Sequence, residues 1–305
     1  MNKSFSGVVL IVLAAIAWGL SGVSGQYLMK QGISVYLLTS LRLLLSGIVL
    51  IAFVLIKQPQ QLKRALSSKR VLAGIFLFSI CGLLLNQFSY LQAIHYTNAG
   101  TATVLQYMAP VLVLAFTCIK NRSLPAVSEI TAIILAILGT FIIATHGQWN
   151  NLALTPLGLF WGLFSAVTYT LYMLLPIQLI REWGSLLVIG LGMFMGGLVF
   201  GLFTQAWQYD LKFQPNTGFA YIGLIAIGSI FAYTALLKGI SLIGAVKGSL
   251  LAAIEPIAAV FFSVTIMKEV FYPLDFIGML FIVLAVLLVS LKDLLTLVRQ
   301  RMQKD

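Results

Sequence analysis

Charge is scarce in this chain of 305 residues, and its scarcity excludes most classes of soluble protein. Only 9% of the residues are charged, while 60% are hydrophobic. Soluble domains carry about 25% charged residues, because charged side chains cover their surface. Acidic residues are especially few, with eight Asp and Glu against 19 Lys and Arg. A chain of this composition is expected in a membrane rather than in water.

The residues that build disulfide frameworks and metal centres are also few. The chain has two histidines and two cysteines, and both Cys81 and Cys118 lie inside long apolar stretches. They predict neither a disulfide framework nor a metal site. The sequence contains no Gly-x4-Gly-Lys-Ser/Thr phosphate loop, so ATP-driven transport by this chain alone is not expected. We therefore expect no metal, no cofactor and no enzymatic activity.

Long apolar stretches fill almost all of the chain instead. A helix rises ~1.5 Å per residue, so ~20 apolar residues cross a hydrocarbon core of ~30 Å. Backbone groups in lipid must bond within their own segment, which favours a helical bundle. The sequence predicts an all-α integral membrane protein whose ten transmembrane helices lie near 7–29, 35–56, 70–92, 97–118, 126–145, 156–178, 185–206, 216–238, 243–265 and 272–293.

The positions of Lys and Arg predict on which side of the membrane each connection between these helices lies. With a cytoplasmic N-terminus, fourteen basic residues lie in inner loops and tails, and only Lys30, Lys212 and Lys268 lie outside. Cytoplasmic loops carry the excess of positive charge, so both termini are expected in the cytoplasm of a multi-pass cell-membrane protein. The net charge of +11 then reflects topology and contact with anionic lipid headgroups, and nucleic-acid binding is not expected.

The chain contains an internal repeat. With an offset of 146 residues, residues 91–116 align with 237–262 without a gap, and Pro110 aligns with Pro256. Each half holds five predicted helices, and an odd number requires the two halves to insert in opposite orientations. We expect two inverted five-helix repeats, residues 1–150 and residues 151–305 with a short cytoplasmic tail. Such repeats commonly enclose a substrate site and open it alternately to each side; the alternative is a duplicated bundle without a transport role.

Several short segments resemble a known family. They are Ala17-Trp18-Gly19-Leu20-Ser21 in the first helix, Ala99 to Pro110 in the fourth, and Ala245 to Glu255-Pro256 with Lys268-Glu269 in the ninth. On these segments the chain resembles the drug/metabolite transporter superfamily, of the ten-helix EamA type. Lys120-Asn121-Arg122 departs from the family pattern because it contains no glutamate. The resemblance implies a secondary transporter, commonly an exporter of amino acids or other small metabolites.

Glu255 is the only carboxylate deep inside a predicted span. An ionisable side chain at that depth is costly, and it usually faces the bundle interior and serves a function. We single out Glu255 as the candidate for proton coupling. The alternative is a structural acid, because Pro256 frees the backbone carbonyl one turn earlier and a carboxyl group can bond nearby polar groups.

Other polar and aromatic side chains recur at helical spacing in several spans and predict an amphipathic cavity for a small metabolite. Arg42 either lines this cavity, attracting a carboxylate or pairing with Glu255, or extends its charged end toward the membrane surface. For each of the others, hydrogen bonding between helices is the alternative role. The substrate-cavity candidates are Trp18, Ser21, Arg42, Asn86, Tyr90, Gln106, Tyr169, Tyr172 and Tyr233.

Two prolines and a set of glycines complete the pattern. Pro110 and Pro256 interrupt the helical hydrogen bonds of their spans and are candidate hinges, with static kinks as the alternative. In the seventh span, Gly192 and Gly196, and likewise Gly197 and Gly201, form small-xxx-small pairs that allow close helix contact. That contact lies either within the chain or between two copies.

The sequence as a whole predicts a secondary active transporter that moves an amino acid or related small metabolite by alternating access, with export favoured by the family resemblance. The expected partners are the small-molecule substrate, the lipid bilayer and, as a candidate, protons; the chain is a monomer or a homodimer. The alternative is a proton-independent facilitator or exchanger of sugars, nucleotide-type metabolites or drugs. A membrane enzyme, a channel and a sensor are further alternatives with less support.

Overall fold

The computed structural model describes residues 3–122, 124–146, 153–243, 248 and 251–302, and these form helices joined by short connections, with no strand among them. The helices are α1 (Lys3–Lys30), α2 (Val35–Lys57), α3 (Pro59–Ser67), α4 (Lys69–Leu77), α5 (Leu85–Tyr96), α6 (Ala99–Gln106), α7 (Ala109–Asn121), α8 (Val127–Thr145), α9 (Pro156–Leu174), α10 (Ile177–Trp183), α11 (Ser185–Phe203), α12 (Pro215–Tyr221), α13 (Ala232–Ile243), α15 (Glu255–Thr265) and α16 (Pro273–Met302). Two π-helical segments, η1 (Phe78–Leu84) and η3 (Ile222–Phe231), and a 3-10 turn, η2 (Ala206–Gln208), lie between them.

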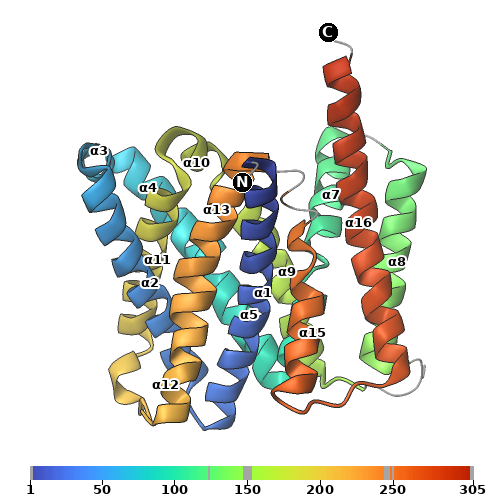
Figure 1. Ribbon diagram of the computed structural model, residues 1–305, viewed down its shortest axis with the longest axis horizontal. Coiled ribbons are helices and arrows are strands. Elements are labelled where there is room, and N and C mark those ends of the chain that lie inside the picture. Colours follow the sequence, from blue (N-terminus) through green and yellow to red (C-terminus); the bar gives the residue numbers. More distant parts are fainter. Residues whose placement is uncertain (1–2, 123, 147–152, 244–247, 249–250, 303–305) are drawn as a thin grey trace.

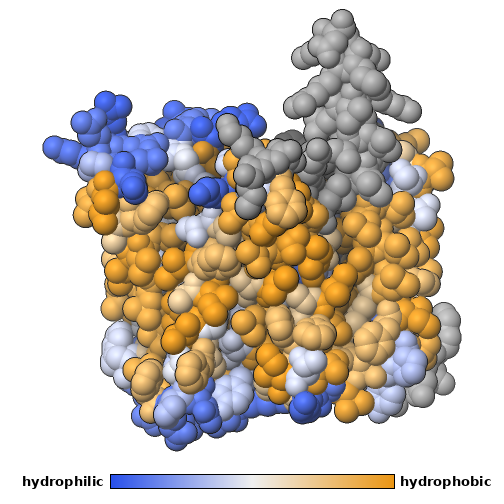
Figure 2. All heavy atoms as spheres, viewed as in Figure 1, coloured by the Kyte–Doolittle hydropathy of each residue, from blue (hydrophilic) through white to orange (hydrophobic). Residues whose placement is uncertain are grey.

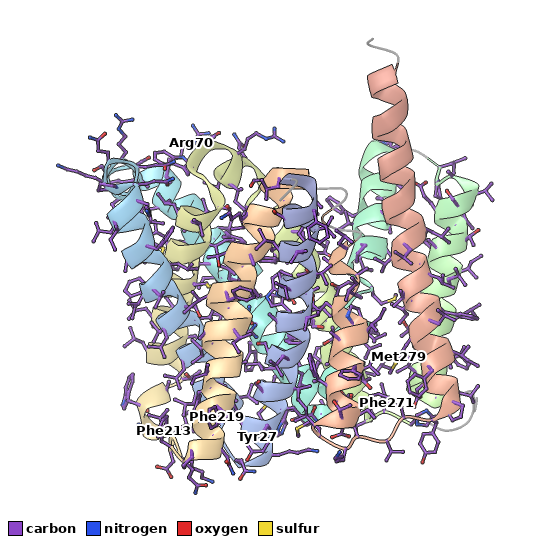
Figure 3. The ribbon with its side chains drawn as sticks, viewed as in Figure 1. Tyr27, Arg70, Phe213, Phe219, Phe271 and Met279 are labelled. Atoms are coloured by element: carbon purple, nitrogen blue, oxygen red, sulfur yellow. The ribbon has the colours of Figure 1, made fainter. Side chains whose placement is uncertain are left out.

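Among the described residues, eight continuous helical segments are long and apolar enough to cross a membrane. Two shorter apolar helices, Glu255–Thr265 and Pro273–Leu288, follow them. The apolar side chains form a broad band on the visible face of the molecule, with hydrophilic side chains at both ends (Figure 2). α1 begins and α16 ends on the same side of the bundle (Figure 1). Arg70 lies at that side, whereas Tyr27, Phe213 and Phe219 lie at the other (Figure 3).

The structure corrects some expected boundaries. The third span is longer than 70–92 and runs from Lys69 to Tyr96, while the sixth bends at Pro176 and continues as α10 to Trp183. Part of the expected ninth helix, 243–265, lies outside the described residues. The connection between the second and third spans, for which the sequence predicts no helix, contains α3. This helix buries Leu62 and Ala65 and leaves its basic residues exposed, so it is amphipathic.

Glycines allow two helix pairs to pack reciprocally. α2 and α11 run in opposite directions, as do α8 and α16 (Figure 1). A Cβ on Gly139 of α8 would lie 2.6 Å from the carbonyl oxygen of Gly278 in α16, and one on Gly278 would lie 2.8 Å from that of Gly139. Between α2 and α11, Gly47 meets the backbone of Phe194 and Gly197 meets the backbone of Leu44. The glycines of the seventh span therefore serve contacts inside the chain.

Irregularities of the backbone recur at the 146-residue offset of the sequence repeat. The fourth span is interrupted at Tyr107–Met108 and the ninth at Ala253–Ile254, a few residues before Pro110 and Pro256 respectively. Each proline lies in the first turn of the helix that follows, a position that suits its fixed backbone angle. The π-helical segments η1 and η3 also correspond at this offset. The two halves therefore share local deformations as well as sequence.

Candidate functional site

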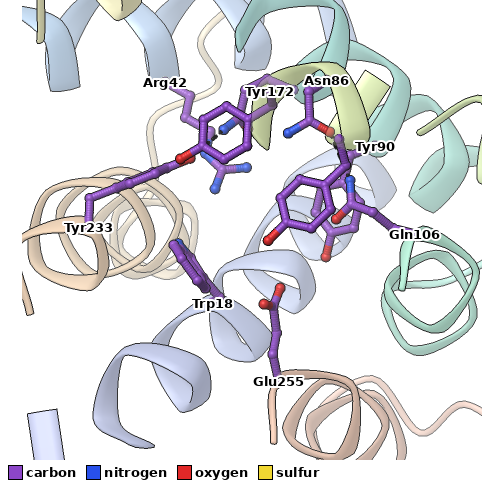
Figure 4. A pocket seen from close by; sticks show the side chains of 10 residues that line it. Trp18, Arg42, Asn86, Tyr90, Gln106, Tyr172, Tyr233 and Glu255 are labelled. Atoms are coloured by element: carbon purple, nitrogen blue, oxygen red, sulfur yellow. Dashed lines mark hydrogen bonds between the residues drawn. The ribbon is translucent and has the colours of Figure 1, made fainter. Parts of the chain in front are cut away.

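A small cavity lies in the centre of the bundle and is lined by side chains from seven helices. Its volume is about 40 Å³, enough for a few water molecules at most. Pockets that hold metabolites measure about 300–1,000 Å³, so the cavity is too small for a metabolite in this conformation. The lining residues, most of them labelled in Figure 4, are Trp18 from α1, Arg42 from α2, Asn86, Gln87 and Tyr90 from α5, Gln106 from α6, Tyr169 and Tyr172 from α9, Tyr233 from α13 and Glu255 from α15.

The structure brings together eight of the nine substrate-cavity candidates, and Glu255 with them. Ser21 is the exception, because it is buried and its hydroxyl donates to the carbonyl of Leu224 in η3 at 3.3 Å. Gln87 lines the cavity and was missed. The repeat offset could have found it, because Gln87 corresponds to Tyr233, and the Gln87 amide donates to the Tyr233 hydroxyl at 3.4 Å. Whether the cavity residues contact a substrate stays a prediction.

Arg42 is buried in the bundle rather than extended toward the membrane surface. Its side chain is only 4% exposed, and Nε donates to the hydroxyl of Ser229 in η3 at 2.9 Å. Nη1 has no hydrogen-bond partner in the part of the chain that the structure describes. Neither ion pair found among the described residues includes Arg42. The guanidinium therefore carries hydrogen-bonding capacity that the protein leaves unused in this conformation.

Glu255 meets a tyrosine at the interruption of the fourth span. The Tyr107 hydroxyl lies 2.9 Å from Glu255 Oε2 and 2.8 Å from the carbonyl oxygen of Ala252. That carbonyl belongs to the residue four positions before Pro256 and loses its helical N–H partner to the proline. A hydroxyl has one hydrogen to donate, so Tyr107 can fully serve only one of these two acceptors. The protonation state of Glu255 therefore affects whether the Tyr107 hydroxyl donates to the Ala252 carbonyl, at the interruption before Pro256.

Aromatic rings and amides form the remaining walls. Tyr169 and Tyr172 stack with centroids 5.6 Å apart, and Tyr233 meets Trp18 edge to face at 5.3 Å. The Gln106 amide donates to Asn86 Oδ1 at 3.0 Å, and the Tyr90 hydroxyl bonds Thr103 at 2.7 Å. The walls therefore offer ring faces for apolar or cationic groups, and hydrogen-bonding groups for polar ones. No His, Cys, Asp or Glu cluster suited to a metal occurs among the residues described.

Comparison with known proteins identifies the chain. The profile of the EamA-like transporter family matches residues 5–145 and 156–291. The chain belongs to the EamA-like transporter family. The family assignment within the drug/metabolite transporter superfamily is therefore confirmed, and the two matches fall on the two halves of the repeat. As an EamA-like chain it is a multi-pass membrane protein with a general role in transport.

Relatives of this EamA-like chain carry transporter names. It is 33% identical to the uncharacterized inner membrane transporter YicL of Salmonella typhimurium, over 95% of this chain and 97% of the relative. It is 25% identical to the uncharacterized transporter YetK of Bacillus subtilis, over 91% of this chain and 84% of that one. A crystal structure that covers 95% of both chains superposes with a TM-score of 0.57 at 17% identity, which shows a shared fold.

A hydrogen-bonded cluster ties this EamA-like bundle together at the end opposite to the start of α1. Glu269 Oε1 accepts from the Gln26 amide and from Lys30 Nζ, each at 2.7 Å. Gln26 Oε1 in turn accepts from the backbone N–H of Ala99, the first residue of α6, at 3.0 Å. The cluster therefore joins α1, α6 and the segment after α15. The helices α1, α6 and α15 each contribute a side chain to the cavity.

We expect Glu269→Ala to destabilise this cluster more than Lys30→Ala does. Gln26 is 3% exposed, so losing its charged acceptor leaves a buried amide unpaired, at about 1–3 kcal/mol. The Lys30 side chain is 54% exposed, and exposed ion pairs contribute about 0–1 kcal/mol. Thermal unfolding of the two purified variants measures the difference. Equal shifts in both variants would show that the buried contact contributes nothing beyond the exposed ion pair.

Proposed function

We propose that this chain is a secondary active transporter that moves a small organic metabolite across the cell membrane by alternating access. Ten helices span the membrane as two inverted five-helix repeats, residues 1–150 and 151–305, with both termini cytoplasmic. The observation that carries the proposal is the small central cavity, which helices of both halves line and which contains Arg42 and Glu255. Buried ionisable groups inside a membrane bundle mark substrate or ion pathways.

Two features support the inverted arrangement. The helix pairs α2 with α11 and α8 with α16 run in opposite directions and pack through reciprocal glycine contacts. The interruptions before Pro110 and Pro256 fall at the same repeat positions. Inverted repeats place the substrate between the halves and expose it to each side in turn. An amino acid or related compound is the proposed cargo and export the proposed direction, as the family resemblance implies.

Uptake into proteoliposomes tests this function. We would reconstitute the purified chain and offer labelled amino acids and small metabolites, with and without an imposed pH gradient. Accumulation that follows the gradient supports secondary active transport coupled to protons. Flux that is indifferent to the gradient would replace active transport by facilitation or exchange, and no flux of any solute above that of protein-free liposomes would contradict the proposal.

Glu255 is the proposed site of proton coupling. When Glu255 is a carboxylate, the Tyr107 hydroxyl donates to Oε2 and the Ala252 carbonyl loses its donor. When Glu255 is protonated it can donate to Tyr107, and the hydroxyl then donates to Ala252 instead. Both alternatives are compatible with the observed distances of 2.9 and 2.8 Å. Proton binding thereby changes which hydrogen bond is made at the interruption before Pro256, a candidate hinge.

We expect Tyr107→Phe to weaken coupling more than it weakens transport itself. The variant removes the hydroxyl that connects Glu255 to the Ala252 carbonyl. Gradient-driven uptake should fall at least several-fold, whereas exchange of substrate for substrate without a gradient should fall much less. Tyr90→Phe is the matched control, because the Tyr90 hydroxyl lines the same cavity but bonds Thr103. An equal loss of both activities in Tyr107→Phe would indicate a purely structural role.

A further inference from the structure

Five exposed basic side chains gather where α2, α3 and α4 meet, at the end of the bundle where α1 begins. They are Lys57 at the end of α2, Lys63 and Arg64 on α3, and Lys69 and Arg70 at the start of α4. Hydrophilic side chains cover this corner of the molecule above the apolar band (Figure 2), and Arg70 is labelled there in Figure 3. The patch therefore presents concentrated positive charge at the edge of the apolar band.

No carboxylate pairs with these side chains in the part of the chain that the structure describes. The first acidic residue of the chain is Glu129. Neither of the ion pairs found among the described residues includes one of the five basic side chains. Glu182 on the neighbouring α10 accepts from Gln178 of its own helix at 3.1 Å. A concentration of unpaired charge of one sign attracts ligands of the other sign.

The basic side chains border a hollow whose helix α3 is anchored on the bundle. Leu62 and Ala65 of α3 pack into the apolar core. The Gln61 amide donates to the carbonyl of Trp183, the last residue of α10, at 3.0 Å. The hollow measures about 590 Å³, and we call it the basic hollow; it is lined by Gln60, Lys63, Arg64, Ser67 and Ser68. Side chains on an anchored helix cost less to order when a ligand binds.

The donors in the basic hollow suit a phosphate group. A guanidinium such as that of Arg64 can bind two phosphate oxygens side by side, and the Lys63 ammonium adds a second positive charge. The Ser68 hydroxyl accepts from the N–H of Val71 at 3.5 Å, so its own hydrogen stays available for an acceptor. Among the described residues, no acidic side chain lines the hollow. The lining therefore favours an anion with several acceptor oxygens.

The internal repeat shows that the fold does not need this charge. The connections 58–68 and 204–214 are counterparts, because α2 and α11 end, and α4 and α12 begin, at the 146-residue offset. Lys212 of the second connection donates to the backbone carbonyl of Gln31 at 3.2 Å. The counterparts of the five basic residues are Phe203, Tyr209, Asp210, Pro215 and Asn216. The same position in the fold is therefore built without any of these five charges.

Apolar side chains lie directly beside the basic ones. Ile56, which precedes Lys57 in α2, is 77% exposed, and Phe53 and Leu66 are exposed as well. They belong to the edge of the apolar band below the hydrophilic corner (Figure 2). A soluble anion gains nothing from such a surface, whereas the acyl chains of a lipid gain contact with it.

We propose that the basic hollow binds the headgroup of an anionic phospholipid. Lys63 and Arg64 contact the phosphate, and the acyl chains lie along the exposed apolar side chains of α2 and α3. The site lies outside the central cavity and is independent of the proposed transport function. The alternative is that the charges only set helix orientation during insertion; the folded protein would then show no preference among lipids.

Lipid binding to the purified full chain tests the proposal. After native lipid is removed in a nonionic detergent, phosphatidylglycerol or phosphatidylcholine with the same acyl chains would be added, and the unfolding midpoint followed against lipid concentration. We expect phosphatidylglycerol to raise the midpoint at about tenfold lower concentration, because choline cancels the phosphate charge. Inorganic phosphate and glycerol phosphate at the same concentrations should have little effect, because they lack acyl chains.

Variants locate the site. Arg64→Gln should weaken the effect of phosphatidylglycerol about fivefold, the contribution of one basic residue near an anionic surface, and Arg64→Lys should retain most of it. Lys238→Gln is the matched control. Lys238 is exposed on α13, and the adjacent Gly239 packs on Gly7 near the start of α1, so this variant removes one charge from the same end of the bundle. Native mass spectrometry of the same proteins counts the bound lipid.

Three outcomes would overturn the proposal. Equal responses to the two lipids would show that the charge of the headgroup is not recognised. An equal loss in Lys238→Gln and Arg64→Gln would replace the site by diffuse attraction. Stabilisation by glycerol phosphate as strong as that by the lipid would make a soluble phosphate the occupant. None of these measurements uses flux, so the proposed transport and the proposed lipid site stand or fall separately.

Discussion

Replacing Glu255 with glutamine is expected to abolish accumulation driven by a pH gradient while the protein stays folded. Glutamine has nearly the same shape and can still bond the Tyr107 hydroxyl, which lies 2.9 Å from Oε2. It cannot bind and release a proton. Coupling that depends on this residue should therefore disappear, with gradient-driven accumulation reduced to the level of protein-free liposomes. Uptake with and without the gradient, together with the unfolding midpoint, measures both parts of the expectation.

The matched control for this variant is Glu269→Gln, which neutralises another carboxylate of the chain. Glu269 belongs to the Gln26–Lys30 cluster at the end of the bundle and does not line the cavity. The Glu269→Gln variant should therefore accumulate substrate in response to the pH gradient as the unaltered protein does. Full coupling in Glu255→Gln would exclude Glu255 as the proton carrier and leave it as a structural acid at the Pro256 interruption.

The second large effect is expected at the crossing of α2 and α11. A Cβ on Gly197 would lie 2.6 Å from the backbone nitrogen of Leu44, and a backbone atom cannot rotate away. We expect Gly197→Ala to force the helices apart at a cost of about 1–3 kcal/mol, the range for overpacked cores. Because α2 carries Arg42, the cavity should be distorted as well. Thermal unfolding measures the loss.

Gly201, one turn along the same helix, provides the comparison. A Cβ there meets its nearest neighbours at 3.7–3.8 Å, which is ordinary contact. Gly201→Ala should therefore be neutral or stabilise the helix by up to about 1 kcal/mol, the difference in helix propensity. Similar destabilisation by both substitutions would show that helix approach at Gly197 does not decide stability.

Much of the helical arrangement could be predicted from the sequence, because apolar length and backbone hydrogen bonding in lipid leave few choices. The cavity followed from polar residues at helical spacing, and Asn86 and Tyr90 on α5 do line it together. The same argument placed Ser21 in the cavity with Trp18, but Ser21 points at η3. Spacing within one helix assigns a face, whereas the neighbour that covers that face depends on packing.

Local departures from regular helix geometry escaped prediction. Nothing in the side chains of residues 78–84 or 222–231 distinguishes a π-helix from an α-helix. The role of Tyr107 was missed because regular spacing was assumed across the fourth span, which is interrupted at that residue. The helix α3 was missed because its nine residues are polar on average and lie beside a long apolar span. In each case the local sequence pattern is compatible with more than one backbone conformation, and packing against the rest of the bundle selects one of them.

The contact between Gln87 and Tyr233 joins two residues that are each other's counterparts in the repeat. Exchanging the conformations of the two halves, as the proposed cycle requires, maps this pair onto itself. The distance between the two positions should thus be the same whichever side of the membrane the cavity faces. The pair Gln26 and Glu269 has no such constraint. Spectroscopic labels at positions 87 and 233 should therefore report the same distance in both end states of the cycle. That distance is an internal reference for the distance between labels at positions 26 and 269, which is free to change.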